Sequence, residues 1–131
     1  MHDLIEQAKT AMTRAYAPYS GFRVGAALRC ADGTVYTGCN VENASYGATN
    51  CAERTAFFKA VSDGKRAFTA IAIVGGTDGV LQDYCPPCGV CRQVMAEFCS
   101  GEFQILLSDG EEIRMLTLDD LLPWRFTDAA L

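Results

Sequence analysis

The sequence predicts an α/β fold: a three-layer α-β-α sandwich around a mixed, roughly five-stranded sheet. Three observations support this. The chain opens with apolar residues at helical spacing, two β-prone runs then meet at a hairpin turn, and helix and strand patterns alternate over the rest of the chain. With 131 residues, half of them hydrophobic, the chain is long enough to bury a core. We therefore expect a single domain spanning residues 1–131.

The first three elements are a helix and a hairpin. Residues 3–16 are predicted to form an amphipathic helix that Pro18 and Gly21 stop. Its apolar face comprises Leu4, Ile5, Ala8, Met12, Ala15 and Tyr16. Strands over 23–30 and 34–40 are joined by an Asp-Gly turn at 32–33. Gly25, followed by two alanines, indicates that another element packs closely against the first of these strands.

The second half alternates helices and strands after the polar, turn-rich segment 41–50. Residues 69–75 are apolar almost throughout, as expected of a central strand covered on both faces. A loop over 75–87 follows this strand. The other expected elements are helices over 51–62 and from 88 or 89 to 99, strands over 103–107 and 112–116, and a short helical turn over 118–122.

Composition narrows the classes of function. The formal net charge is -5 and the basic residues are scattered, so no nucleic-acid-binding surface is expected. No apolar run approaches the ~20 residues that span a bilayer, and the first residues lack the layout of a signal peptide. An odd count of seven cysteines cannot form a complete disulfide framework within one chain. We expect a cytoplasmic protein with reduced thiols, whose cysteines bind metal or take part in catalysis.

Two motifs point to a metal site: Cys51-Ala52-Glu53-Arg54, and Pro87-Cys88-Gly89-Val90-Cys91. Cys88 and Cys91 lie three residues apart and therefore share a face where a helix begins. Cys51 opens another helix, and a helix N-terminus favours thiolate over thiol. Three thiolates with a fourth position open are typical of catalytic zinc, whereas structural zinc sites have four protein ligands. The expected cofactor is one Zn²⁺ per chain.

Glu53 has two interpretations, and Arg54 beside it has one. Asn50 and Glu53 have the spacing of a capping box, but beside a zinc ligand a carboxylate is placed to move protons. Arg54 could offset the excess negative charge of three thiolates by donating hydrogen bonds to the ligand sulfurs, as groups around a metal site commonly do.

Two alternatives for the cysteines remain open. Cys88 and Cys91 alone match a redox Cys-x-x-Cys pair, which leaves Cys51 and Glu53 unexplained. Cys85 could complete a structural four-cysteine site, although Pro86-Pro87 favours an extended approach that turns it away. Three other cysteines are expected to be small buried hydrophobes: Cys30, Cys39 and Cys99. His2, near the N-terminus, is not expected to bind the metal.

Together with four segments, these residues resemble the small homotetrameric cytidine deaminases. The matching segments are Tyr19–Ala27, Gly38–Gly47, Cys51–Arg54 and Pro87–Val94, and the Leu121-Leu122-Pro123 tail with Phe126 is also similar. The resemblance implies zinc-dependent hydrolysis of cytidine and deoxycytidine to uridine and deoxyuridine in pyrimidine salvage. Cys51, Cys88 and Cys91 would bind zinc, hydroxide at the metal would attack C4, and Glu53 would shuttle protons.

The resemblance also implies the substrate contacts. Asn40 and Glu42 match ribose-binding residues, Phe22 an aromatic wall of the pyrimidine pocket, and the backbone of Ala52 a contact to the base. Tyr46 and Phe126 would reach a site across a subunit interface of a homotetramer. The alternatives are a solvated loop for Asn40 and Glu42, and core packing for Phe22. Trp124-Arg125 and Tyr84-Cys85 depart from the family pattern.

Other functions stay in competition. Blasticidin S deaminase shares the two cysteine motifs, but the segment Asn40–Asn43 favours a nucleoside substrate. Deaminases that act on polynucleotides are disfavoured by the acidic charge. A non-enzymatic, zinc-stabilised binding protein would use Glu53 only as a helix cap.

Overall fold

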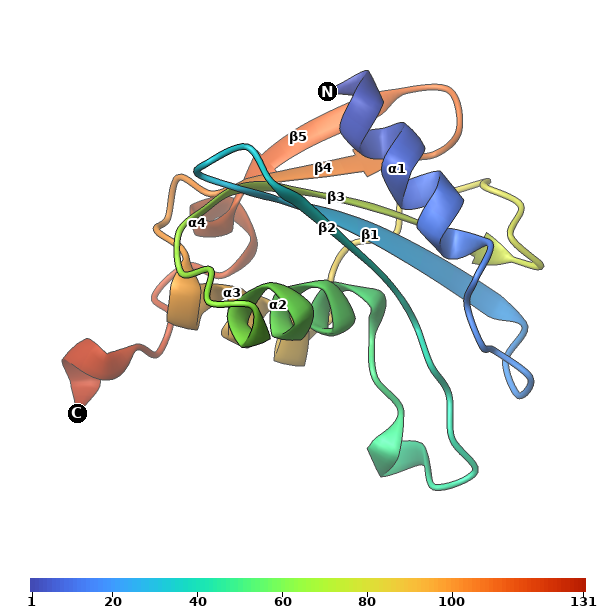
Figure 1. Ribbon diagram of the computed structural model, residues 1–131, viewed down its shortest axis with the longest axis horizontal. Coiled ribbons are helices and arrows are strands. Elements are labelled where there is room, and N and C mark those ends of the chain that lie inside the picture. The colour runs from blue at the N-terminus through green and yellow to red at the C-terminus, as the bar shows by residue number, and fades with distance from the viewer.

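The computed structural model describes residues 1–131 and has one mixed sheet of five strands, in the order β2-β1-β3-β4-β5 (Figure 1). Only β3 and β4 run parallel, and every other pair is antiparallel. The strands are β1 (Phe22–Cys30), β2 (Val35–Cys39), β3 (Phe68–Thr77), β4 (Gln104–Ser108) and β5 (Ile113–Thr117). The helices are α1 (His2–Met12), α2 (Ala52–Ser62), α3 (Gly89–Phe98) and α4 (Leu118–Leu121), with 3-10 turns η1 (Tyr46–Ala48) and η2 (Asp128–Ala130).

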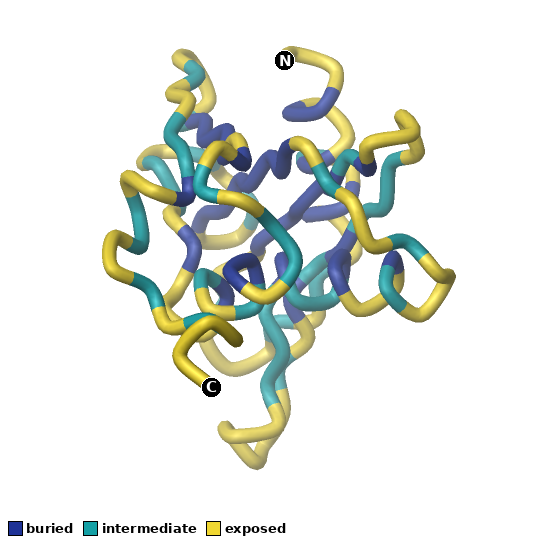
Figure 2. Tube along the Cα trace, turned by 90° about the vertical axis from the view of Figure 1, so that its left-hand side faces the viewer, coloured by how far each residue is buried: buried dark blue, intermediate teal, exposed yellow.

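Helices cover both faces of the sheet, which confirms the predicted three-layer architecture. In Figure 1, α1 lies on one side of the strands and α2 and α3 lie on the other. Because side chains alternate along a strand, β1 contributes Val24, Ala26 and Leu28 to the core beneath α2 and α3, and Ala27 to the core beneath α1. Buried residues follow the strands through the centre of the molecule (Figure 2). None of the helices is long and apolar enough to cross a membrane.

Two glycines let the helices approach the strands closely. A Cβ atom on Gly25 would lie 2.0 Å from the Ala8 carbonyl oxygen in α1, so the close packing predicted at this position is present. On the opposite face, a Cβ atom on Gly38 would lie 2.5 Å from the Ala52 carbonyl oxygen in α2. Neither position has room for a side chain, so these two glycines set the distance from the sheet to α1 and α2.

The first helix is shorter than predicted. It ends at Met12 instead of continuing to residue 16, and Tyr16 is mostly exposed. The backbone of Tyr16 instead accepts from the Glu42 N–H and donates to the Asn40 carbonyl. This bridge to the segment after β2 uses the backbone groups of Tyr16 that a longer helix would need. The strand expected over 69–75 is longer than predicted and runs from Phe68 to Thr77.

Candidate active site

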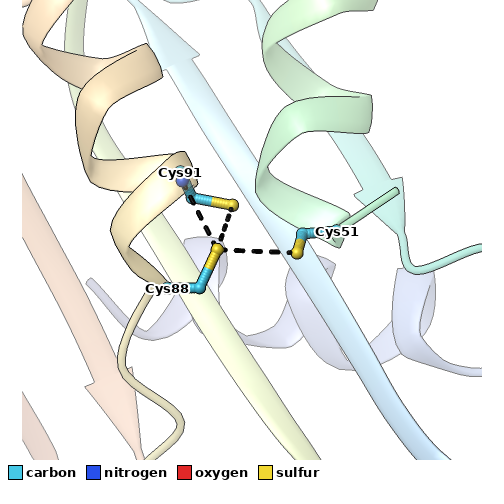
Figure 3. A group of neighbouring side chains, drawn as sticks. All are labelled: Cys51, Cys88 and Cys91. Carbon is cyan, nitrogen blue, oxygen red and sulfur yellow. Dashed lines mark hydrogen bonds between the residues drawn. The ribbon is translucent and has the colours of Figure 1, made fainter. Parts of the chain in front are cut away.

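Two helix N-termini converge on a cluster of three thiols. Cys51 is the N-cap residue of α2 and Cys88 is the N-cap residue of α3, with Cys91 in the first turn of α3. The Cys51 and Cys88 sulfurs lie 3.7 Å apart, and those of Cys88 and Cys91 lie 3.3 Å apart (Figure 3). All three sulfurs lie within 4.8 Å of one another. The structure thus brings together the three predicted ligands, although Cys51 and Cys88 are 37 residues apart in the sequence.

The cluster fits zinc in both geometry and donor chemistry. In a tetrahedral site with Zn–S bonds of about 2.3 Å, sulfurs are separated by about 3.8 Å. The cluster is near this spacing without a fourth protein ligand. Interaction with the Cys91 thiol, aided by a hydrogen bond from Arg54, lowers the pKa of Cys51 to about 5, whereas the pKa of Cys91 is raised in turn. In the metal-free chain Cys51 is therefore the thiol prepared to ionise to thiolate, the form that binds the metal.

Arg54 makes the contact that was predicted for it. Its guanidinium donates to the Cys51 sulfur over 3.2 Å, and contact with this thiolate raises the pKa of Arg54 further. A fixed positive charge therefore lies beside one of the three thiols.

The remaining cysteines stand apart from the cluster. Cys85 is not among the grouped thiols, and burial raises its pKa to about 12, so the four-cysteine alternative is not supported. Its sulfur instead occupies the space beside Gly75, 3.0 Å from where a Cβ atom would be. Cys30 is buried, Cys39 and Cys99 are partly buried, and all seven cysteines are free. His2, exposed at the start of α1, is also outside the cluster.

Glu53 is not a helix cap. The N-cap residue of α2 is Cys51, whose side chain makes no capping hydrogen bond, so the alternative of a capping box between Asn50 and Glu53 is not supported. The Asn50 amide instead donates to the Thr55 hydroxyl. Glu53 is 4% exposed, and burial, followed by the charge on Cys51, raises its pKa to about 7. A carboxyl group with a pKa near neutrality, next to a cluster of thiols that fits zinc, is suited to proton transfer.

Asn40 and Glu42 are anchored by more bonds than a solvated loop provides. The Asn40 side chain, 8% exposed, accepts from the Val24 N–H and donates to the Phe22 carbonyl, each over 2.8 Å. The Glu42 carboxylate accepts from the N–H groups of Tyr19 and Ser20 and from the Ser20 hydroxyl. Both side chains therefore hold the segment that leads into β1.

Phe22, Ala52, Tyr46 and Phe126 have different environments. Phe22 is 39% exposed at the start of β1, which does not match simple core packing. Ala52 is the first residue of α2, where its N–H has no partner within the helix. Tyr46 and Glu42 line the same cavity of about 370 Å³. Phe126 is exposed in the C-terminal tail, and its carbonyl accepts a hydrogen bond from Gln93 of α3.

The sequence alone gave no indication that Ser20 contacts Glu42. Its hydroxyl donates to Glu42 and accepts from the Phe22 N–H over 3.0 Å. A serine in a turn is common, so its type carries no signal. Only its place two residues before Phe22 could have drawn attention to it.

Comparison with known proteins gives the family. Residues 1–107 match the family described as "Cytidine and deoxycytidylate deaminase zinc-binding region". The chain belongs to this cytidine deaminase family. A cytidine deaminase from Sporosarcina psychrophila is 54% identical over 95% of this chain and 89% of its own length. One from Halalkalibacterium halodurans is 52% identical, over 95% and 92% of the two chains.

Solved structures agree with this membership. A crystal structure of cytidine deaminase from Burkholderia pseudomallei matches with a TM-score of 0.88 and 52% identity, covering 95% of this chain and 98% of that one. A blasticidin-S deaminase from Bacillus cereus is 29% identical over 95% of this chain and 91% of its own length. The zinc-binding family and the cluster of Cys51, Cys88 and Cys91 together assign one Zn²⁺ to each chain of this deaminase.

Proposed function

We propose that this deaminase hydrolyses cytidine and deoxycytidine to uridine and deoxyuridine, releasing ammonia. The observation that carries the proposal is the buried Glu53, with its raised pKa, beside a cluster of three thiols that fits zinc. A zinc-stabilised binding protein does not need a buried carboxyl group there, and the cap that would explain Glu53 otherwise is absent.

Glu53 carries the protons of the reaction. When bound, zinc supplies a Lewis acid that lowers the pKa of water to about 7. Glu53 accepts the proton of the attacking water and delivers it to N3 of the pyrimidine as the new bond forms at C4. It then takes the proton of the new C4 hydroxyl and transfers it to the amino group, which leaves as ammonia while the C4 carbonyl of uridine forms. A pKa near the working pH suits a group that must both accept and donate.

Arg54 supports this centre electrostatically. Its positive charge beside Cys51 offsets part of the negative charge of three thiolates, which would otherwise weaken the metal as a Lewis acid. The N–H group of Ala52, free at the start of α2, is available to a polar atom of the base.

The free hydrogen-bonding positions of Glu42 and Asn40 suit a nucleoside with free sugar hydroxyls. An ionised carboxylate offers about four acceptor positions. The backbone and Ser20 occupy three of those on Glu42, which leaves one for a sugar hydroxyl. Asn40 retains one N–H and one lone pair for the same sugar, while the exposed ring of Phe22 offers a flat apolar surface to the base.

We also propose a homotetramer in which neighbouring chains complete each site. The segment between β2 and α2 projects from the body of the molecule and carries η1 at its tip (Figure 1), where the backbone is exposed (Figure 2). Tyr46, in η1, is 78% exposed, and Phe126 is 60% exposed. Such large exposed aromatic side chains on protruding segments are common at protein interfaces.

The proposal extends to the setting of the reaction. We assign the enzyme to pyrimidine nucleoside salvage in the cytoplasm, with residues 1–131 acting as one cytidine deaminase-like domain. Seven free cysteines suit a reducing compartment.

The test is release of uridine and ammonia from cytidine by zinc-replete protein. Turnover is expected for the wild type, and Glu53→Gln should lose roughly 10²–10⁴-fold or more in kcat while keeping its zinc. Glu97→Gln, which changes an exposed carboxylate on α3, is the matched control and should keep full activity. No turnover of cytidine by protein with one zinc per chain would contradict the proposal, and blasticidin S would be the next substrate to assay.

A further inference from the structure

Ser20 lies between two groups assigned to opposite ends of the substrate. Its hydroxyl donates to Glu42 Oε2 and accepts from the Phe22 N–H over 3.0 Å. A hydroxyl has one proton to donate, and here that proton goes to the carboxylate. One side chain thus connects the proposed sugar contact with the backbone of the proposed base contact.

Phe22 is held at both of its backbone groups. Ser20 accepts from its N–H, and the Asn40 amide donates to its carbonyl over 2.8 Å. The ring is partly exposed and lies beside Gly75, with its Cε2 atom 3.1 Å from the point where a Cβ atom on Gly75 would be. Because the ring is attached to this backbone, a shift of the Phe22 backbone would move the ring.

Glu42 has one acceptor position free, and it lies on the oxygen that Ser20 binds. Oε1 already accepts two backbone N–H groups, over 2.9 and 3.1 Å, whereas Oε2 accepts only the Ser20 hydroxyl. The free acceptor position is thus on Oε2. A sugar hydroxyl that binds there shares this oxygen with Ser20.

We propose that Ser20 is a positioning residue that couples recognition of the sugar at Glu42 to the placement of the Phe22 ring against the base. The inference rests on the proposed function, which supplies the roles of Glu42 and Phe22. It adds Ser20, which contacts neither the sugar nor the base and acts through Glu42 and Phe22.

The test compares Ser20→Ala, Ser20→Thr and the control Ser62→Ala, which removes an exposed serine hydroxyl at the end of α2. Loss of the two hydrogen bonds should raise KM for cytidine about tenfold. The kcat value should change less than about threefold, because Glu53 and the metal ligands are untouched. Ser20→Thr keeps the hydroxyl and should restore KM to near the wild-type value. Ser62→Ala should match the wild type.

Titration of Glu42 tests the hydrogen bond from Ser20 directly. The Ser20 hydroxyl is the main cause that holds the pKa of Glu42 below its ordinary value. Its removal raises that pKa, so Glu42 becomes protonated at higher pH. Because Glu53 governs the acid limb of kcat/KM, the pKa of Glu42 is followed by NMR titration of its side-chain carboxyl carbon. That pKa should rise in Ser20→Ala and stay in place in Ser20→Thr and Ser62→Ala.

The outcomes distinguish this inference from the proposed function. If the wild type deaminates cytidine but Ser20→Ala keeps its KM and the pKa of Glu42, the coupling is wrong and the function stands. A drop in kcat alone, with KM unchanged, would also overturn it. If zinc-replete wild type does not act on cytidine, the proposed function fails and the coupling fails with it. Ser20→Cys, with a weakly hydrogen-bonding thiol of similar size, repeats the test should the alanine variant unfold.

Discussion

Glu53 illustrates how one buried group makes stability depend on pH. Its pKa in the folded, metal-free chain is about 7, above its ordinary value of 4.5. Between these values the unfolded chain releases a proton that the folded chain keeps. The free energy of unfolding of zinc-free protein should therefore be highest below pH 4.5 in this respect and fall by about 3 kcal/mol as the pH rises through 7.

Urea unfolding at pH 5 and pH 8, with chelator present, measures this effect. The lowered pKa of Cys51 acts in the opposite direction over this range, so the contribution of Glu53 is the difference between the wild type and Glu53→Gln, which cannot ionise at this position. Glu97→Gln, exposed on α3, should retain it. Parallel pH profiles for the wild type and Glu53→Gln would show that Glu53 titrates normally in the folded chain.

Cys91 and Cys85 form a second contrast between single residues. The Cys91 sulfur belongs to the cluster, whereas Cys85 is held as a neutral thiol by burial, with a pKa raised to about 12. Cys91→Ser should therefore lose bound zinc after dialysis, and Cys85→Ser should keep one zinc per chain. Elemental analysis of the purified variants decides between them, and loss of zinc from Cys85→Ser would restore the four-cysteine alternative.

At the scale of elements, substitutions of Gly38 and Gly25, which lie against α2 and α1, should affect zinc binding differently. Gly38→Ala would push a Cβ atom against the α2 backbone and should cost about 1–3 kcal/mol of unfolding free energy. Because α2 begins beside Cys51, zinc affinity should fall as well. Gly25→Ala should cost a similar amount but leave zinc affinity unchanged, since it displaces α1 on the opposite face.

Denaturant unfolding and competitive zinc titration measure these two effects. Gly47→Ala is the control, because nothing lies within 4 Å of the added Cβ atom. Equal zinc affinities in the Gly38 and Gly25 variants would mean that the position of α2 does not govern the metal site.

Much of the fold could be predicted because periodicity and turn residues are local signals. The hairpin, the central strand and the starts of α2 and α3 followed from them. The end of α1 did not, because the backbone of Tyr16 forms hydrogen bonds with the backbone of Asn40 and Glu42, which are distant in the sequence. A capping box at Asn50 and Glu53 was the alternative to proton transfer, but the capping box is found at Thr117 and Asp120. The turn that precedes each helix decides which side chain can reach the amides.

The candidate site shows the same division. Cys51, Cys88 and Cys91 were identifiable because sulfur ligands have few other uses at such spacing, and they do meet in space. Asn40 and Glu42 also hold the segment 19–24 by hydrogen bonds, and Ser20 takes part in this contact. These roles depend on the fold, which brings residues 19–24 against residues 40–42. No residue type or spacing within either segment encodes that meeting.

For the whole molecule, the proposed assembly predicts that inactive chains rescue one another. Glu53→Gln and Tyr46→Ala subunits should each be poorly active alone. After mixing and reassembly, sites that combine an intact Glu53 from one chain with an intact Tyr46 from another will form. Random mixing in equal amounts should restore about a quarter of wild-type activity.

Rates of the mixed and unmixed proteins, alongside their molecular masses by sedimentation, provide the test. If each site lies within a single chain, no subunit carries both intact residues. The rate of the mixture would then equal only the sum of the rates of the two variants measured separately, and the shared-site arrangement would be wrong.

The meeting of two helix ends has a consequence for the unfolded chain. A metal held jointly by Cys51 and Cys88 would close a loop of 37 residues around the central strand β3, as a covalent cross-link does. A cross-link over that length restricts the denatured ensemble by about 4 kcal/mol. That is a large share of the 5–15 kcal/mol that typically separates folded from unfolded protein. Zinc scarcity in a cell would then lower the amount of this protein as well as its turnover, because chains without metal would be degraded sooner.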